Sequence, residues 1–266
     1  MSCLGTLLGA TIGLFFGGPL GAIAGAAFGS WATSFKDTRS SENDREDGSP
    51  YSQNWNRRMN SQEHAQMTFF VGVFSILGKL AAVDGRVSPQ ERAKVEEFID
   101  TELRPDPETR ASALRIFDAA AVSGESFYQL TNQFYSKFRF QPQFFELLID
   151  IMIRVAEVDS GINEKEETLI IDAVHIFRFS EERYRQLRAR HGSGRGFSRS
   201  SAYAVLGCSP EDSEEALKKA YRRLVSEYHP DKIASKGLPE EFAKMAADKF
   251  REIQSAYEEI RKERGF

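Results

Sequence analysis

The sequence predicts an all-α protein with a single transmembrane helix, a helical bundle and a small helical domain at the C-terminus. The first 35 residues contain no charged side chain, and such a segment is long enough to cross a bilayer as a helix. In the rest of the chain apolar residues recur at helical spacing, as in Phe70, Phe74 and Leu77. No long stretch alternates apolar and polar residues in the way that a half-buried strand does. These three observations together favour helices throughout.

Length and composition restrict the function. The chain has 266 residues, enough for about two domains, and a net charge of −4. That charge argues against a general nucleic-acid binder, which carries a strong basic excess. The two cysteines, Cys3 and Cys208, form no CxxC pair. Neither a zinc module nor a disulfide framework is therefore available, and we expect a reducing, cytoplasmic setting for the charged part of the chain.

The first element is the uncharged segment, which we take as residues 1–35. No Lys or Arg precedes its apolar part, so we expect a permanent anchor rather than a cleaved signal peptide. Pro19 leaves two arrangements open, a kinked helix and a re-entrant hairpin. Lys36, Arg39 and Arg45 follow the segment, and the positive-inside rule then places the C-terminal side in the cytoplasm. This describes a single span with the rest of the chain on the cytoplasmic side.

Glycines recur at every fourth position of this segment. On a helix, steps of four residues stay close to one face, so the repeat makes a groove without side chains. A second helix can approach such a groove until the backbones touch, which predicts a homodimer in lipid. The alternative is that small residues only keep the segment thin and lipid-soluble. The predicted dimerisation residues of this glycine zipper are Gly5, Gly9, Gly13, Gly17, Gly21, Gly25 and Gly29.

Two polar stretches divide the remainder of the chain. Residues 36–62 are rich in Ser, Asn, Asp, Glu and Arg, which is typical of a flexible tether. Residues 191–200 have the Gly and Ser content of a linker. Between them we predict a compact helical domain over residues 63–190, and after them a second domain over residues 201–266.

The middle domain contains an internal repeat. Two ten-residue segments, AVDGRVSPQE and EVDSGINEKE, align 75 residues apart, and each reads as helix, acidic turn, N-cap and helix. Ser88 and Asn163 are the predicted N-caps, with Glu91 and Glu166 three residues later as their capping-box partners. Capping therefore accounts for much of the repeat without a ligand.

The same turns suggest a second interpretation, because hard divalent cations prefer carboxylate oxygens. The turns share the pattern D-x-x-[VI]-[SN]-x-x-E and resemble those of the tellurite-resistance TerB family over residues ~65–187. That resemblance implies a pseudo-symmetric bundle of about seven helices and leaves room for a divalent ion. We prefer capping, and we expect no other cofactor. The candidate metal ligands are Asp84, Glu91, Asp159 and Glu166.

The C-terminal domain reads as a series of short helices. A first apolar helix ends at Gly207, and Ser213 caps a second helix. Pro230 ends that helix, because the residue before a proline is pushed out of the α region. A loop and a third amphipathic helix follow. Cations between the apolar positions of the second helix give it a basic side that faces solvent: Lys218, Lys219, Arg222 and Arg223.

Three motifs make this domain similar to the J-domain family. They are Y-x-V-L-G, then K-K-A-Y-R-R-L-x-x-x-Y-H-P-D-K, then K-F-x-x-I-x-x-A-Y-E-x-I. The resemblance implies three or four helices with the His-Pro-Asp tripeptide at the tip of a hairpin. It also implies that the domain stimulates the ATPase of a DnaK-class chaperone and is not itself an enzyme, so no catalytic residue is expected. The implied chaperone-binding residues are His229, Pro230, Asp231, Lys218, Lys219, Arg222, Arg223 and Lys232.

The whole order of parts resembles the membrane-anchored DnaJ-like co-chaperones of bacteria. This resemblance implies a single-pass type III protein of the bacterial inner membrane that recruits a DnaK-class chaperone there. Lipid, a second copy of the chain and an unidentified client or signalling protein are the further expected partners; nucleic acid is not expected, on the grounds of net charge. Envelope stress is the expected setting. One alternative is a membrane stress sensor whose TerB-like domain binds a divalent ion or a signalling partner. Another is a pore made by the glycine-rich segment.

Overall fold

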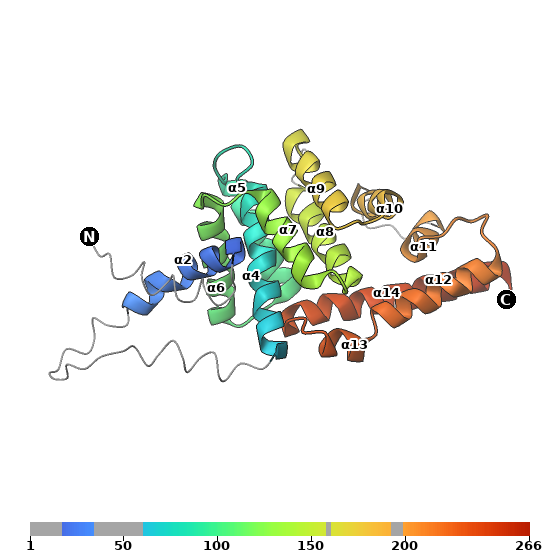
Figure 1. The fold of residues 1–266 in the computed structure, drawn as a ribbon. Coiled ribbons are helices and arrows are strands. Elements are labelled where there is room, and N and C mark those ends of the chain that lie inside the picture. Colours follow the sequence, from blue (N-terminus) through green and yellow to red (C-terminus); the bar gives the residue numbers. More distant parts are fainter. Residues whose placement is uncertain (1–17, 35–60, 158–160, 193–198) are drawn as a thin grey trace. The chain divides into compact units, whose positions relative to one another are not determined.

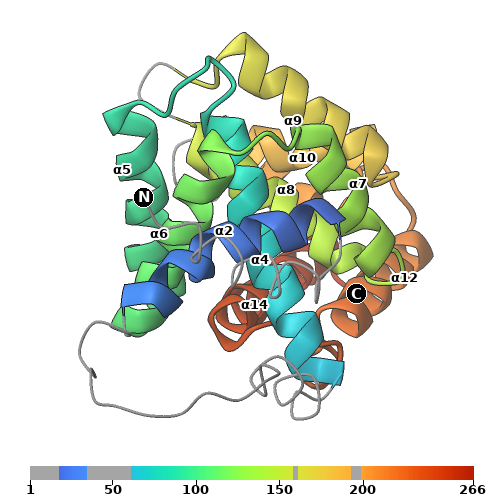
Figure 2. The same ribbon diagram turned by 60° about the vertical axis from the view of Figure 1, so that its left-hand side comes forward.

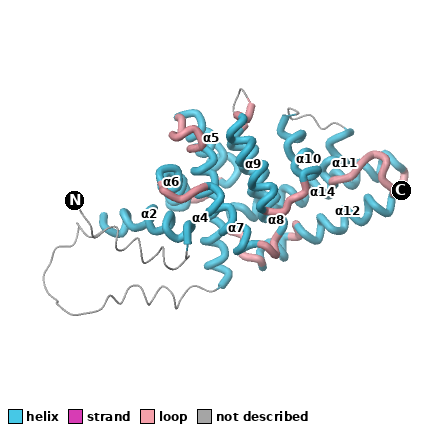
Figure 3. The backbone as a smooth tube through the Cα atoms, turned by 45° about the horizontal axis from the view of Figure 1, so that its top comes forward, coloured by secondary structure: helices cyan, strands magenta, loops and turns pink. Residues whose placement is uncertain are grey.

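The computed structural model describes residues 18–34, 61–157, 161–192 and 199–266. All regular structure in these ranges is helical, and none of it forms a β-strand, so the predicted all-α class is confirmed (Figures 1 and 3). The chain contacts separate two compact units. The first comprises residues 1–92 and 105–137, the second residues 93–104 and 138–266, and α5 (Pro89–Phe98) crosses the boundary between them.

The first unit is built around α4 (Ser61–Ala81), which packs most extensively on α6 (Pro107–Val122). Consecutive apolar residues make α4 buried on nearly all sides over its second half, and the rings of Phe69 and Phe74 are fully buried. Phe69 also lies 5.5 Å, centroid to centroid, from Phe134 of α7 (Phe127–Phe138). A helix with apolar residues all round belongs in a protein core, and α4 is the core of this unit.

Close approach of α4 to α6 depends on a glycine. A Cβ atom on Gly78 would lie 2.4 Å from the Phe117 carbonyl oxygen and 3.1 Å from the Ala120 Cβ. At the end of the same contact, the Lys79 ammonium donates to the Ser123 carbonyl at 2.7 Å, and burial lowers the pKa of Lys79. Gly78 therefore sets the distance between the two central helices.

The apolar N-terminal segment contributes α2 (Gly18–Ser34), which packs on α6 and α4 (Figure 2). Gly18 has φ +65°, and Pro19 lies in the first turn, where its missing N–H breaks no helical hydrogen bond. The Leu20 N–H donates to the Gln133 Oε1 at 2.8 Å, and Ile23 and Ala24 are buried. Pro19 thus starts a helix in the described part of the chain.

Other expectations for this segment stay predictions. Among the described residues, none of the helices combines the length and apolarity that a membrane crossing requires. Gly21 and Gly25 are buried within this unit, and Gly29 lies in α2. The remaining four glycines of the zipper, and the choice between a kink and a hairpin, fall on residues 1–17, outside the described ranges.

The second unit is built around α8 (Pro142–Ala156), whose residues are almost all buried. It packs on α9 (Glu164–Ile176) and on α10 (Glu181–Gly192), and the Phe145 ring stacks on Phe177 at 4.7 Å. The C-terminal domain belongs to the same unit. Its helices are α11 (Arg199–Leu206), α12 (Glu214–Glu227), α13 (Pro230–Ser235) and α14 (Glu240–Arg264), and a π-helical turn η2 (Ile99–Leu103) contacts α14.

Gly78→Ala is expected to lower the thermal unfolding midpoint of the chain. Overpacking costs about 1–3 kcal/mol, which outweighs the up to about 1 kcal/mol that alanine gains in helix propensity. Gly124→Ala is the control, because no atom lies within 4 Å of a Cβ at that position. An unchanged or raised midpoint for Gly78→Ala would contradict the close contact between α4 and α6.

Candidate functional site

The hairpin of α12 and α14 carries the tripeptide that the sequence singled out. The Ser213 Oγ caps α12 by accepting a hydrogen bond from the Ala216 N–H at 3.2 Å. Leu217 and Leu224 are fully buried, and the rings of Tyr221 and Tyr257 stack at 4.0 Å. Because α12 packs along α14 on this side, its cations remain on the opposite, solvent-facing side.

Arg264 closes the base of the hairpin. Its Nε donates to the Tyr203 hydroxyl at 3.0 Å, its Nη1 donates to the Asp212 carbonyl at 2.6 Å, and its guanidinium lies 5.3 Å from the centre of the Tyr203 ring. One side chain at the end of α14 therefore holds both α11 and the turn that precedes α12. The base of the hairpin is fixed by these contacts, and the tripeptide lies at the far end of α12.

At that end, α12 stops at its C-cap Tyr228, directly before the tripeptide, as the position of Pro230 predicts. The sequence predicted a loop after the tripeptide, but residues 230–235 form the short helix α13, with Pro230 as its first residue. The Asp231 N–H donates to the His229 Nδ1 at 3.3 Å, and the His229 ring meets the Phe250 ring edge-on at 6.0 Å. The imidazole is thus oriented from two sides, while the Asp231 side chain is 92% exposed.

The four predicted cations of α12 do not have equal surroundings. Lys218 pairs with Glu214, which raises the pKa of Lys218, and Arg223 pairs with Glu227 at 3.3 Å. Among the described residues, no such ion pair involves the other two cations, Lys219 and Arg222. Exposed pairs one helical turn apart are worth only a few tenths of a kcal/mol, so a partner's carboxylate can replace them.

A shallow open depression runs along α12 to the tripeptide. Its lining includes Tyr221, Val225 and His229, which follow at intervals of four residues and so form one stripe of the helix. Arg222, Ser226 and Lys232 border it, and the Lys232 ammonium donates to the Ser226 hydroxyl. The sequence analysis missed Val225 and Ser226, because it sorted α12 by charge; the four-residue spacing back from His229 was the available signal.

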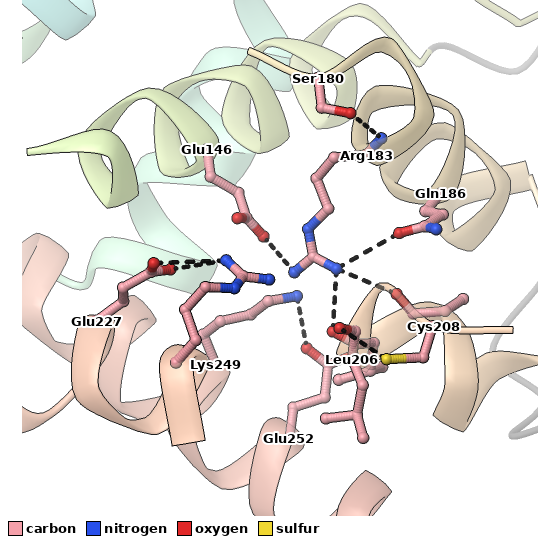
Figure 4. A network of polar contacts seen from close by, with 12 residues as sticks. Glu146, Ser180, Arg183, Gln186, Leu206, Cys208, Glu227, Lys249 and Glu252 are labelled. Atoms are coloured by element: carbon pink, nitrogen blue, oxygen red, sulfur yellow. Dashed lines mark hydrogen bonds and ion pairs between the residues drawn. The ribbon is translucent and has the colours of Figure 1, made fainter. Parts of the chain in front are cut away.

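A buried ion pair joins α8 and α10 in the second unit. Glu146 of α8 and Arg183 of α10 face one another, with 3.0 Å between Oε1 and Nη2, and their side chains are only 9% and 10% exposed (Figure 4). Burial alone would lower the pKa of Arg183, but the charge of Glu146 and their hydrogen bond raise it. The sequence analysis singled out neither residue.

The same guanidinium reaches α11. Nη1 of Arg183 donates to the Ala204 carbonyl at 3.3 Å and to the Val205 carbonyl at 3.2 Å. These groups belong to the last turn of α11, which carries the negative end of the helix dipole. The Ala204 carbonyl also accepts from the Gly207 N–H at 3.2 Å. The helix ends in a Schellman motif, since the Cys208 N–H donates to the Tyr203 carbonyl at 2.9 Å and Gly207 has φ +68°.

Tyr228 of the C-terminal domain lines the same cleft as Glu146. The residue directly precedes the tripeptide and is 2% exposed. Burial, and next the negative charge of Glu146, raise the pKa of Tyr228 well above its ordinary value, so the phenol stays protonated. We name the set of Glu146, Arg183 and Tyr228 the Arg183 cluster.

The two acidic turns form the predicted caps. The Ser88 N–H donates to Glu91 Oε2 at 2.6 Å and the Glu91 N–H to Ser88 Oγ at 3.2 Å, and Asn163 and Glu166 make the same reciprocal pair. Among the described residues, no three His, Cys, Asp or Glu side chains are placed to hold a metal ion. Asp159 lies outside those residues, so a metal site that includes it stays a prediction.

Comparison with protein families divides the chain into three matches. Residues 1–34 match the transmembrane domain of the co-chaperone DjlA, residues 71–189 match the tellurite resistance protein TerB, and residues 201–264 match the DnaJ domain. The last match contains the tripeptide, the cations of α12 and the depression beside them.

Several relatives are similar over nearly the whole chain. The co-chaperone protein DjlA of Coxiella burnetii is 30% identical, with 99% of each chain covered, and that of Photobacterium profundum is 28% identical, with 98% of this chain and 99% of the relative covered. DjlA of Escherichia coli K12 is 28% identical over 77% of this chain and 83% of its own. No solved structure matches the chain.

Arg183→Met is expected to destabilise the second unit by about 3–5 kcal/mol, because it leaves the buried Glu146 carboxylate without its partner. Arg185→Met on the same helix is the control: Arg185 and Glu182 form a pair whose side chains are 72% and 61% exposed, and such pairs contribute about 1 kcal/mol or less. Thermal unfolding of both variants measures the difference. Equal midpoints would show that the buried pair contributes no more than the surface pair.

Proposed function

Because this chain belongs to the DjlA family of DnaJ-like co-chaperones, we propose that it stimulates ATP hydrolysis by a DnaK-class chaperone through His229, Pro230 and Asp231 and through the basic side of α12. The observation that carries this proposal is the tripeptide itself: it stands at the tip of a well-packed hairpin, with the Asp231 carboxylate almost fully exposed. The match to the DnaJ domain over residues 201–264 supports it.

Each part of the site has a physical task in this proposal. The exposed Asp231 carboxylate can accept charge-assisted hydrogen bonds from a cation of the chaperone. His229 offers a polar ring whose orientation is set by Phe250 and by the Asp231 N–H. Lys219 and Arg222 can steer the domain toward an acidic surface. No residue of this chain takes part in the hydrolysis; binding favours the hydrolysing state of the partner, which is a coupling between two sites.

We further propose that the N-terminal segment anchors the chain in the inner membrane with the other domains on the cytoplasmic side. Support comes from the match to the DjlA transmembrane domain over residues 1–34, from the absence of charge over residues 1–35 and from the cations that follow. Anchoring would restrict chaperone recruitment to the membrane surface. Dimerisation through the glycine repeat would present two tripeptides together.

His229→Gln in the full chain is expected to abolish stimulation of a DnaK-class ATPase, measured as steady-state phosphate release, and to leave the unfolding midpoint unchanged. His175→Gln serves as the control, because His175 is exposed, lies outside the J-domain and has its Nε2 3.4 Å from the Glu181 Oε1. Full stimulation by the His229→Gln chain would overturn the proposed function.

Arg222→Gln is expected to slow association with the chaperone by about three- to tenfold at low salt, and Lys218→Gln to slow it less, because Lys218 is already paired with Glu214. Stopped-flow binding at several salt concentrations measures both rates. If the two substitutions have the same effect, the ion pairs on α12 do not control which cations reach the partner.

Gly13→Leu and Gly17→Leu are expected to reduce chemical crosslinking of the full-length chain in membranes, because a leucine side chain fills the groove that would bring two helices together. Leu14→Ala, next to Gly13, is the matched control. Crosslinking that is unchanged in both glycine variants would count against the dimer.

A further inference from the structure

We propose that helices α8 and α10 of the middle domain form a docking surface for the J-domain, and that the Arg183 cluster holds the tripeptide in its binding conformation from below. This deepens the proposed function and rests on it: the middle domain would determine how readily His229, Pro230 and Asp231 engage a DnaK-class chaperone. The partner of this surface is the C-terminal domain of the same chain.

The first argument is that one guanidinium connects the two domains. Arg183 is held within the middle domain by Glu146 and donates to two carbonyls at the end of α11. Gly207 closes the contact from the other side, because a Cβ there would lie 2.8 Å from Arg183 Nη1. Arginine suits this task, since its planar fork donates to a carboxylate and to carbonyls at once. A lysine has all its donors on one nitrogen, whereas here Nη2 donates to Glu146 and Nη1 to the carbonyls.

The second argument is the position of Tyr228. This residue ends α12 and directly precedes His229, so its backbone sets the direction in which the tripeptide leaves the helix. Its side chain is buried and lines the same cleft as Glu146. Burial, and next the charge of Glu146, raise the pKa of the phenol. The middle domain therefore restricts the chain one residue before the tripeptide, while the Asp231 side chain remains in solvent. A contact below the tripeptide that leaves it exposed positions the motif and does not block it.

The third argument is the polar character of the rest of the contact. A cleft of about 350 Å³ separates parts of α8 and η2 from α14, and many of the side chains that line it are charged, among them Glu102, Asp150, Arg154, Asp248 and Glu252. Arg154 pairs with Asp150 at 2.9 Å and with Glu102 at 3.3 Å, both within the middle domain. Polar and partly open contacts of this kind are typical of domains that separate and rejoin.

Together these features allow the contact to control how readily the tripeptide binds the chaperone. Fixing the residue before the tripeptide removes conformational freedom that the chaperone would otherwise have to restrict on binding. A ligand of the middle domain that shifts α10 relative to α8 would withdraw Arg183 from α11 and return that freedom. Through this surface the middle domain can change the conformation of the tripeptide without contacting the chaperone.

The test uses the full chain in lipid nanodiscs with Arg183→Lys and Glu146→Gln, and with Arg185→Lys as the matched control on α10. Amide hydrogen exchange should rise at least threefold over residues 203–208 and 228–232 in both variants, with residues 217–224 inside α12 unchanged. The concentration of chain that gives half-maximal stimulation of a DnaK-class ATPase should rise about three- to tenfold, while maximal stimulation stays the same.

The outcomes separate this proposal from the proposed function. Loss of maximal stimulation in His229→Gln together with unchanged exchange and unchanged half-maximal concentration in the two cluster variants would overturn the docking surface alone. Increased exchange inside α12 would mean that the J-domain unfolds without the cluster, which would also contradict a positioning role. If wild type itself gives no stimulation, the proposed function is wrong, and the exchange data still decide whether the two domains are docked.

Discussion

The ion pair that the buried guanidinium of Arg183 makes with Glu146 is the interaction on which the packing of the second unit depends. Its charge is removed from water, and this is tolerable only because Glu146 and two helix-end carbonyls replace the lost solvation. The same requirement fixes geometry. Glu146 has to point from the largely buried helix α8 toward Arg183, and α11 has to end where its carbonyls can be reached. One desolvated charge therefore constrains three helices, α8, α10 and α11.

Stability and activity are divided between the two ends of the J-domain. Arg264 and Tyr203 hold the base of the hairpin, and the stacked rings of Tyr221 and Tyr257 hold its length. At the tripeptide end, the His229 ring meets the Phe250 ring, its Nδ1 accepts from the Asp231 N–H, and the His229 carbonyl accepts from the N–H groups of Lys232 and Ile233. A recognition motif has to stay accessible, so its rigidity must come from what lies behind it. In this chain Tyr228 supplies that support.

Two capping boxes start helices in the middle domain. Ser88 with Glu91, and Asn163 with Glu166, satisfy free N–H groups at the starts of two helices. Glu166 is 4% exposed, so its carboxylate needs these hydrogen bonds to be stable where it is. The spacing of Ser88 and Glu91, and of Asn163 and Glu166, is thus that of a capping box.

The features that the sequence determined by itself are those that depend on neighbours three or four residues away. Helical periodicity, the two capping boxes, the end of α12 before Pro230 and the basic side of α12 are all of this kind, and the His-Pro-Asp tripeptide could be assigned from the helices that flank it. The tertiary structure alone decided which of the basic residues are paired, that the segment after the tripeptide is helical, and that α2 packs on α4 and α6.

It also decided the Arg183 cluster, because Glu146 and Arg183 are 37 residues apart and Arg183 and Val205 are 22 apart. In sequence Glu146 looks like a surface carboxylate on an amphipathic helix. Only the packing of α8 removes it from water, and burial is what turns an ordinary charge into one that must be paired.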